Sequence, residues 1–333
     1  MKLRTIVTIA SGVTLTAAIL QVPAQAQEPD KMRRVGVLMG YAESDSEAQA
    51  RLSVFKKTLA GLGWNEGRNL RFETRWSAGD VNRASALARE LVALQPDVIL
   101  CSTTPATAAL QRETSTIPIV FTVVSDPVGS GFVKTLSHPG GNITGFVNLE
   151  ASLAEKWLQV LKEIAPRVNR VAVMYNPDTA TSAEYYLRPL SVASSKLRVV
   201  VIPSVVRRNA NIEAAITALA RQPNTGLIVL VDSFMVVHRK GAIELAARHK
   251  VPAVYFATYF VAEGGLISYG VDVVDLFRRA APYVDQILRG ASAASLPVQQ
   301  PTKFELAINR ITANALGLTI SQSLRIRADE VIE

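Results

Sequence analysis

The chain has 333 residues, of which 49% are hydrophobic, and its formal net charge is +8. This length and apolar content suffice for two hydrophobic cores of ordinary domain size. The Lys and Arg residues are scattered and occur mostly as pairs, such as Arg33-Arg34. Such pairs are typical of solvated surfaces and argue against a nucleic-acid partner. The single cysteine, Cys101, excludes an intrachain disulfide, and its place in an apolar run predicts a buried thiol.

The N-terminus is predicted to be a signal peptide. Lys2 and Arg4 precede a mostly apolar segment from Ile6 to Leu20, and Ala24-Gln25-Ala26 forms a small-residue cleavage site. A membrane anchor is disfavoured because the segment is shorter than the roughly 20 apolar residues that a spanning helix needs. No cysteine lies near position 26 to carry a lipid. We therefore expect cleavage after Ala26, a soluble periplasmic protein, and a net charge that falls from +8 to +6 with the loss of Lys2 and Arg4.

The first half of the chain predicts strands that alternate with helices. Ser46 and Gln49 fit a capping box at the start of a helix that ends near Gly61. Alternating or continuous apolar runs predict the strands 35–39, 70–76, 97–101, 118–123 and 142–147. Apolar residues at steps of three and four predict further helices at 81–94 and 105–113.

The same succession is predicted again in the second half. A helix with Leu153, Trp157, Leu161 and Ile164 on one face ends before Pro166. Predicted strands follow near 170–175, 198–202, 226–231, 252–256 and 266–269, with helices between them. A helix near 273–289 contains Pro282, which is expected to kink it or split it in two. A linker at 297–301 leads to 304–308, the last predicted strand.

Three apolar segments of the first half resemble segments of the second half, which indicates a duplicated unit. Residues 34–39 match 170–175, 95–100 match 222–230, and 117–121 match 251–255. The matches keep their order at an offset of about 130 residues, the length of one domain. Strands alternating with helices are typical of parallel sheets. We therefore predict an α/β fold of two similar Rossmann-like lobes with parallel sheets and a cleft between them.

The lobe boundaries follow from these segments. The first lobe is predicted to comprise 33–147 plus about 270–302, and the second 148–268 plus about 308–333. No low-complexity linker separates them, so the chain is expected to cross near 147, 267 and 303. These three crossovers would form a hinge.

The common signatures of enzymes and metal sites are missing from the sequence. There is no phosphate-binding P-loop, no Gly-x-Gly-x-x-Gly after the first strand and no Gly-x-Ser-x-Gly elbow. His138, His238 and His249 lack the spacing of a zinc site. We expect no metal and no cofactor, although a catalytic triad built from distant residues stays open.

Polar residues at the ends of predicted strands in the first lobe are candidates for ligand binding. Open α/β sheets bind ligands at the carboxyl ends of their strands. The first-lobe candidates are Tyr41, Ser102, Thr103, Thr104, Ser125 and Asp126. Ser102 to Thr104 open a helix, so their hydroxyls and the free N–H groups suit a carboxylate, or they serve only as an N-cap. Asp126 either pairs with a ligand ammonium or closes an Asx-turn before Pro127.

The second lobe offers a complementary set. Its candidates are Asn148, Asn176, Asp178, Thr179, Asp232 and Phe256. Asp232 takes the place of Ser102 in the internal repeat, so its carboxylate would attract an amine, and the two lobes would divide a zwitterion between them. Phe256 and Tyr259 either stack on an apolar ligand part or belong to the core, whereas residues 176–178 are also consistent with a plain turn.

Several motifs together resemble one family. They are RVGVLMG from Arg34, LGWNEGRNL from Leu62, PDVIL from Pro96, IPIVF from Ile117, SDPV from Ser125, PGGNITG from Pro139 and GGLISYG from Gly264. This set is similar to the ABC-transporter substrate-binding proteins of the tryptophan/tyrosine-binding (TrpX-like) type, over nearly all of residues 33–333. The resemblance implies a type I periplasmic-binding-protein fold and partnership with a membrane permease and its ATPase. It also implies ligand contacts from Thr103, Thr104, Asp126, Asn148, Asn176 and Asp232.

The sequence thus predicts a non-catalytic solute-binding protein of an ABC importer that closes its lobes on a small ligand. An aromatic or apolar amino acid is the leading ligand, while an amide, a peptide or a nucleoside stays open. The alternative is a secreted two-lobe enzyme that uses the same cleft. A DNA-binding repressor is disfavoured because the predicted signal peptide leaves no room for a helix-turn-helix. A monomer is expected because it suits docking to a permease.

Overall fold

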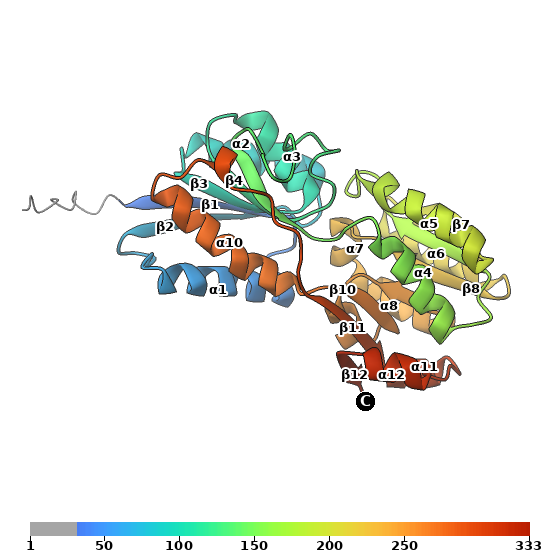
Figure 1. Cartoon of the computed structure of the whole chain (residues 1–333). Coiled ribbons are helices and arrows are strands. Elements are labelled where there is room, and N and C mark those ends of the chain that lie inside the picture. The colour runs from blue at the N-terminus through green and yellow to red at the C-terminus, as the bar shows by residue number, and fades with distance from the viewer. Residues whose placement is uncertain (1–31) are drawn as a thin grey trace, which may run out of the picture. The chain divides into compact units, whose positions relative to one another are not determined.

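The computed structural model describes residues 32–333, so the predicted signal peptide lies outside the described residues. Within this range the chain forms two α/β lobes, each built on its own sheet (Figure 1). The predicted fold class is confirmed. No helix within residues 32–333 is both long and apolar enough to cross a bilayer.

The first sheet has five strands in the order β2-β1-β3-β4-β5, all parallel. Its strands are β1 (Arg33–Met39), β2 (Leu70–Trp76), β3 (Val98–Ser102), β4 (Ile119–Val124) and β5 (Ile143–Val147). β3, β4 and β5 are buried along their whole length, as expected for strands with helices on both faces. Because the strands are parallel, their carboxyl ends all lie at one edge of the sheet.

Helices from distant parts of the sequence cover this sheet. α1 (Ser46–Gly61) and α10 (Val273–Leu288) contact each other on one face, and α2 (Val81–Ala93) and α3 (Thr104–Glu113) contact each other on the opposite face (Figure 1). The Trp64 indole N–H donates to the Asp285 carboxylate at 2.8 Å and ties the loop after α1 to α10. The first core is therefore completed by a segment that follows most of the second lobe in sequence.

The second sheet has seven strands in the order β12-β11-β10-β9-β8-β6-β7. They are β6 (Arg170–Tyr175), β7 (Val200–Val205), β8 (Thr225–Val229), β9 (Ala253–Tyr255), β10 (Ile267–Val271), β11 (Phe304–Asn309) and β12 (Glu330–Ile332). The β10–β11 pair is antiparallel, and the other pairs are parallel. The antiparallel pair forms where the chain returns from the first lobe.

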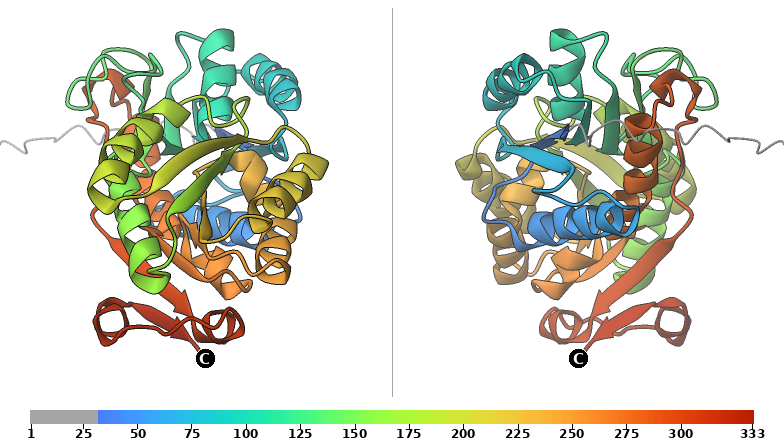
Figure 2. Two further views of the ribbon diagram at one scale, coloured as in Figure 1. Left: turned by 90° about the vertical axis from the view of Figure 1, so that its right-hand side faces the viewer. Right: turned by 90° about the vertical axis from the view of Figure 1, so that its left-hand side faces the viewer.

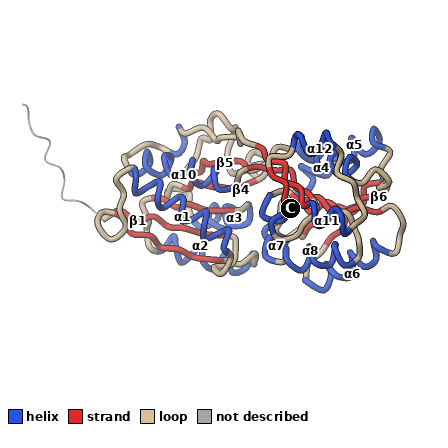
Figure 3. The backbone as a smooth tube through the Cα atoms, turned by 90° about the horizontal axis from the view of Figure 1, so that it is seen from below, coloured by secondary structure: helices blue, strands red, loops and turns tan. Residues whose placement is uncertain are grey.

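Helices also cover both faces of the second sheet (Figure 3). α4 (Leu153–Ile164) contacts α5 (Ala183–Leu197), whereas α6 (Asn209–Ala220) contacts α8 (Arg239–Arg248) on the other face. The short helices α7 (Ser233–Val237) and α9 (Thr258–Ala262) follow β8 and β9. At the C-terminus, α11 (Arg310–Ala315) and α12 (Gln322–Arg327) lie beside β12 (Figure 2).

Three connections join the lobes. Residues 148–152 lead from β5 to α4, Asp272 leads from β10 to α10, and residues 289–303 lead from α10 through the 3₁₀ turn η1 (Ala293–Ser295) to β11. The last connection runs along β5, because the Thr144 hydroxyl donates to Leu296 O at 2.6 Å and the Val147 N–H donates to Gln299 O at 2.9 Å. The last connection therefore lies beside β5, the strand that leads into the first connection.

At two places the structure differs from the local expectations. The N-cap of α1 is Asp45 and not Ser46, because the Asp45 carboxylate accepts the Ala48 N–H at 2.9 Å. Of the two outcomes expected at Pro282, the split does not occur, because α10 runs through this residue as one helix. Contacts with α1 and β4 along its length offset the one hydrogen bond that a proline removes.

The C-terminal elements were not foreseen. The sequence predicted 304–308 as the last strand, but α11, α12 and β12 follow it. These elements are short, and such short segments show no helical or strand periodicity long enough to identify them.

The expected burial of Cys101 is confirmed. The residue is 0% exposed, and its Sγ lies 3.2 Å from the Thr107 hydroxyl. Burial raises the pKa of the thiol to about 12, so it is protonated and unreactive at neutral pH.

Trp157 ties α4 to β10 and provides a test of the second core. It is 0% exposed, and its indole N–H donates to Tyr269 O at 2.7 Å. Trp157→Phe should lower the free energy of unfolding by about 1–3 kcal/mol, because it leaves a carbonyl without its donor. Urea unfolding measures the loss. Trp64→Phe, at a partly exposed site, is the control and should cost less; an unchanged Trp157→Phe variant contradicts the role.

Candidate functional site

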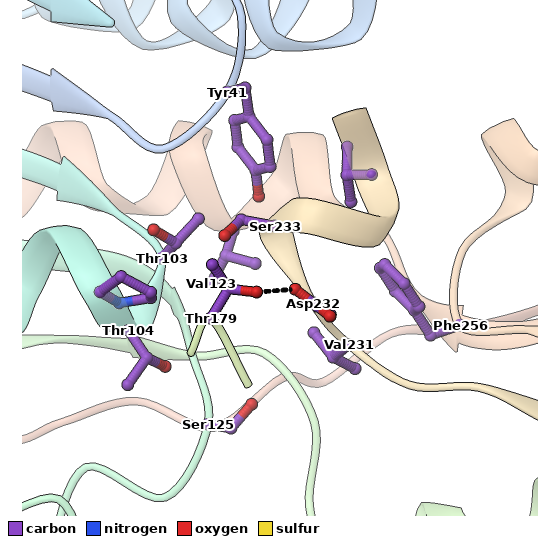
Figure 4. A pocket seen from close by; sticks show the side chains of 12 residues that line it. Tyr41, Thr103, Thr104, Val123, Ser125, Thr179, Val231, Asp232, Ser233 and Phe256 are labelled. Carbon is purple, nitrogen blue, oxygen red and sulfur yellow. Dashed lines mark hydrogen bonds between the residues drawn. The ribbon is translucent and has the colours of Figure 1, made fainter. Parts of the chain in front are cut away.

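A cavity lies between the two lobes, at the carboxyl ends of strands from both sheets (Figure 4). Its volume with the lobes in this arrangement is about 20 Å³, close to what one ordered water molecule needs. The first lobe contributes Tyr41, Thr103, Thr104, Pro105, Val123 and Ser125. The second lobe contributes Thr179, Val231, Asp232, Ser233, Val236 and Phe256. Because both lobes supply walls, a molecule held here touches both.

The structure brings together many of the residues that the sequence singled out. The candidates that line this cavity are Tyr41, Thr103, Thr104, Ser125, Thr179, Asp232 and Phe256. They come from loops that follow β1, β3, β4, β6, β8 and β9. Parallel pairing places these strand ends at the cavity, which is why positions so far apart in sequence meet.

The N-terminus of α3 forms the polar corner of the first lobe. Thr103 is its N-cap but makes no capping hydrogen bond through its side chain. Its Oγ1 has no partner among the described residues, although the residue is only 5% exposed. Its φ of +91° and ψ of 150° lie in a region that costs a non-glycine residue about 1–3 kcal/mol and that recurs at ligand sites. The free hydroxyl and the positive end of the helix together suit an anionic group.

Asp232 forms the polar corner of the second lobe. Its Oδ2 accepts the Asn176 N–H at 2.6 Å, and its Oδ1 accepts the Phe234 N–H at 2.8 Å as the N-cap of α7. Oδ1 also accepts the Thr179 hydroxyl (Figure 4). One carboxylate thus joins the loops after β6 and β8 and also presents negative charge to the cavity.

The ionisation of Asp232 is shifted. Burial raises the pKa of Asp232 to about 6, because loss of hydration outweighs the hydrogen bonds from Thr179 and from backbone N–H groups, including those of Asn176 and Phe234, which favour the charged form. The carboxylate is therefore ionised at neutral pH and becomes protonated in mildly acidic solution.

The remaining wall is aromatic and aliphatic. Tyr41 and Phe256 approach the cavity from opposite lobes (Figure 4), and Val123, Val231 and Val236 add aliphatic wall. Burial raises the pKa of Tyr41, so its hydroxyl is neutral. Phe256 packs edge-on against Phe260 at 5.1 Å between ring centroids. Tyr259, considered with Phe256 as a stacking residue, does not line the cavity.

Three predicted residues are buried behind the lining. Ser102, Asn148 and Asn176 are at most 5% exposed. The Asn148 Oδ1 accepts the Ser125 hydroxyl at 3.2 Å, and the Asn176 Oδ1 accepts the Asp178 N–H at 2.9 Å. These amides hold the loops that carry Ser125 and Thr179, so the structure gives them a positioning role.

Asp126 and Asp178 do not line the cavity. The Asp126 carboxylate accepts the Gly129 N–H at 2.8 Å, which is the turn role considered as the alternative to ligand binding. Asp178 is exposed and forms an ion pair with Arg207. In both cases the carboxylate already has a partner outside the cavity.

The sequence missed part of the lining. Five lining residues are not among those predicted from the sequence: Pro105, Val123, Val231, Ser233 and Val236. Val231 and Ser233 flank Asp232, so their proximity was a usable signal. Val123 faces the cavity where the register of β4 against β5 shifts and its φ becomes +55°. No sequence pattern signals such a bulge in a valine-rich strand.

Within residues 32–333, no group of three His, Cys, Asp or Glu side chains is placed to hold a metal ion.

Comparisons with known proteins agree with this architecture. The family model described as ABC transporter substrate binding protein matches residues 35–332. The tyrosine-binding protein of Clostridioides difficile strain R20291 is 27% identical over 264 residues, which cover 79% of this chain and 75% of that protein. The resemblance found in the sequence is confirmed.

Two solved structures share the fold. A crystal structure of a conserved domain protein from Vibrio cholerae is 32% identical, with a TM-score of 0.84 over 90% of this chain and 100% of that chain. The ABC domain from Streptococcus pneumoniae in complex with L-Trp is 24% identical, with a TM-score of 0.82 over 90% of this chain and 99% of that chain.

The raised pKa of Asp232 predicts a pH dependence of stability. Below pH 4 the carboxyl is protonated in both the folded and the unfolded chain, but between about pH 4 and 6 only the folded chain retains the proton. The contribution of Asp232 to the free energy of unfolding should therefore fall by about 3 kcal/mol as the pH rises through this window. Urea unfolding of the wild type and of Asp232→Asn between pH 4 and 8 measures it. A stability difference that stays constant over pH 4–6 contradicts the assignment.

Proposed function

This chain belongs to the family of ABC transporter substrate-binding proteins, and from that premise we propose that it is the periplasmic component of an importer for an aromatic or apolar amino acid. Proteins of this family are substrate-binding proteins and not enzymes, so the expectation of a non-catalytic protein is confirmed. Their partners are a small-molecule ligand and an ABC transporter. The predicted signal peptide supports the periplasmic location.

The polarity of the cavity carries the proposal. Thr103 with the N-terminus of α3 stands on the first lobe, and the Asp232 carboxylate stands on the second. An α-carboxylate at α3 and an α-ammonium near Asp232 match these two corners in charge. The side chain would then lie against Tyr41 and Phe256, which favours an apolar or aromatic group.

The relatives point the same way. The Clostridioides difficile relative is a tyrosine-binding protein, and the Streptococcus pneumoniae structure contains L-Trp. An aromatic amino acid is therefore the first ligand to test.

The mechanism is closure of the lobes around the ligand. Direct contacts already join the lobes beside the cavity, where the Tyr186 hydroxyl donates to Ser125 Oγ at 2.8 Å and the Ser130 and Ser182 hydroxyls lie 3.3 Å apart. A ligand that bridges both polar corners stabilises this closed state over an open one. A monomer in this state would dock on the permease, whose separate ATPase drives transport.

Native mass spectrometry of the freshly purified protein tests the function. We expect a co-purified molecule with the mass of an amino acid. Calorimetry with L-tyrosine, L-tryptophan, L-leucine and a hexose then ranks the ligands, and recovery of unchanged ligand separates binding from turnover. Preference for the hexose, or conversion of the ligand, refutes the proposal.

Thr103→Val tests the carboxylate corner. Loss of one hydroxyl that binds a charged group should weaken amino-acid binding by roughly 10- to 100-fold. Thr107→Val is the matched control, because it removes a buried hydroxyl from the same helix that bonds only to Thr103 O and Cys101. Calorimetry on both variants decides; equal affinities for Thr103→Val and Thr107→Val would place the carboxylate elsewhere.

A further inference from the structure

A second contact between the lobes lies outside the cavity and is built from charged and aromatic side chains. We call it the interlobe latch. It consists of Asp45 and Arg51 from the first lobe and Arg239, Tyr259 and Glu263 from the second. None of these side chains lines the cavity.

Arg239 is the centre of the latch. The residue is only 6% exposed, and its Nη1 forms an ion pair with the Asp45 carboxylate of the opposite lobe. Its Nε and Nη2 donate to Glu263 Oε1 at 2.9 and 2.7 Å, within its own lobe. The guanidinium therefore keeps one carboxylate partner when the lobes separate and loses the other.

Arg51 adds an aromatic contact across the lobes. Its guanidinium carbon lies 5.2 Å from the ring centroid of Tyr41 and 4.8 Å from that of Tyr259. Tyr259 also contacts Arg239 at 5.5 Å, so its ring meets a guanidinium from each lobe. Arg51 is 1% exposed, and its Nε and Nη2 have no hydrogen-bond partner among the described residues.

These contacts act on closure in opposite directions. The Asp45–Arg239 pair and the stacking on Tyr259 exist only while the lobes touch, so they favour the closed state. Burial of the Arg51 guanidinium without full hydrogen bonding disfavours it. Tyr41 connects the latch to the ligand, because its ring contacts Arg51 while the residue lines the cavity.

We propose that the interlobe latch sets how often the empty protein closes, and that Asp45 and Arg239 thereby determine ligand affinity without touching the ligand. Apparent affinity scales with the population of the binding-competent state. The effect on affinity rests on the proposed ligand function, whereas the effect on closure does not.

Two variants break the Asp45–Arg239 ion pair, one from each lobe. Asp45→Asn removes the charge but keeps the cap of α1, because asparagine caps a helix as well as aspartate does. Arg239→Gln removes the cation. Arg207→Gln is the control, since it breaks an exposed ion pair with Asp178 inside the second lobe. Thermal unfolding confirms that each variant is folded, and Asp45→Asn serves alone if Arg239→Gln is not.

Double electron–electron resonance measures the distance between two spin labels, one on each lobe, and so reports the closed population of the ligand-free protein directly. Spin labels attach to Lys57→Cys on the first lobe and Lys196→Cys on the second, both exposed, while the buried native Cys101 stays unlabelled. We expect the closed population to fall about tenfold in Asp45→Asn and Arg239→Gln and to stay unchanged in Arg207→Gln.

Calorimetry with L-tyrosine completes the test. Affinity should fall by about the same factor in both latch variants. The double variant should show no further loss, because both substitutions break the same Asp45–Arg239 ion pair. An unchanged closed population or an unchanged affinity in Asp45→Asn overturns the proposal. If the wild type binds none of the amino acids, the proposed ligand class is wrong. The distance measurement still tests the effect of the latch on closure.

Discussion

The two sheets meet at their carboxyl edges, and the functional features of the chain depend on this arrangement. A parallel sheet gathers the ends of its strands, and the starts of the helices that follow them, at one edge. When two such edges face each other, the N-terminus of α3 lies across the cavity from the start of α7. Two positive helix ends near one small space need negative charge. Asp232 supplies it at α7 as the N-cap, whereas α3 has no such cap from its own side chains. The cavity is therefore polarised by the fold itself.

Unsatisfied polar groups gather where the lobes meet. Buried side-chain atoms without a partner occur within residues 32–333 in Arg51, Ser102, Thr103, Asn148, Glu263 and Ser268. Except for Ser268, all of them lie at the cavity, directly behind it or in the interlobe latch. Buried polar groups are normally hydrogen-bonded, so their concentration here marks a surface shaped for something other than stability. The strained backbone of Thr103 belongs to the same pattern.

The cavity and the interlobe latch affect closure of the lobes in different ways. The cavity recognises the chemistry of a ligand, through one corner on each lobe. The latch, at α1, α8 and α9, adjusts the equilibrium between open and closed forms through charges that a ligand does not meet. Tyr41 lines the cavity and its ring contacts Arg51 of the latch, which allows occupation of the cavity and formation of the latch to support each other.

The sequence by itself determined the succession of strands and helices, the duplication and the family, because apolar periodicity and turn residues are local signals. It also predicted cavity-lining residues such as Thr103, Thr104, Thr179, Asp232 and Phe256, because the change from apolar to polar residues marks the end of each strand. Only the tertiary structure decided which of the polar residues face the cavity. Positive φ angles turn Thr103, Val123 and Asp126 in directions that no local pattern predicts. Partners distant in the sequence, such as Arg239 for Asp45 and Arg207 for Asp178, decide which carboxylates are already engaged.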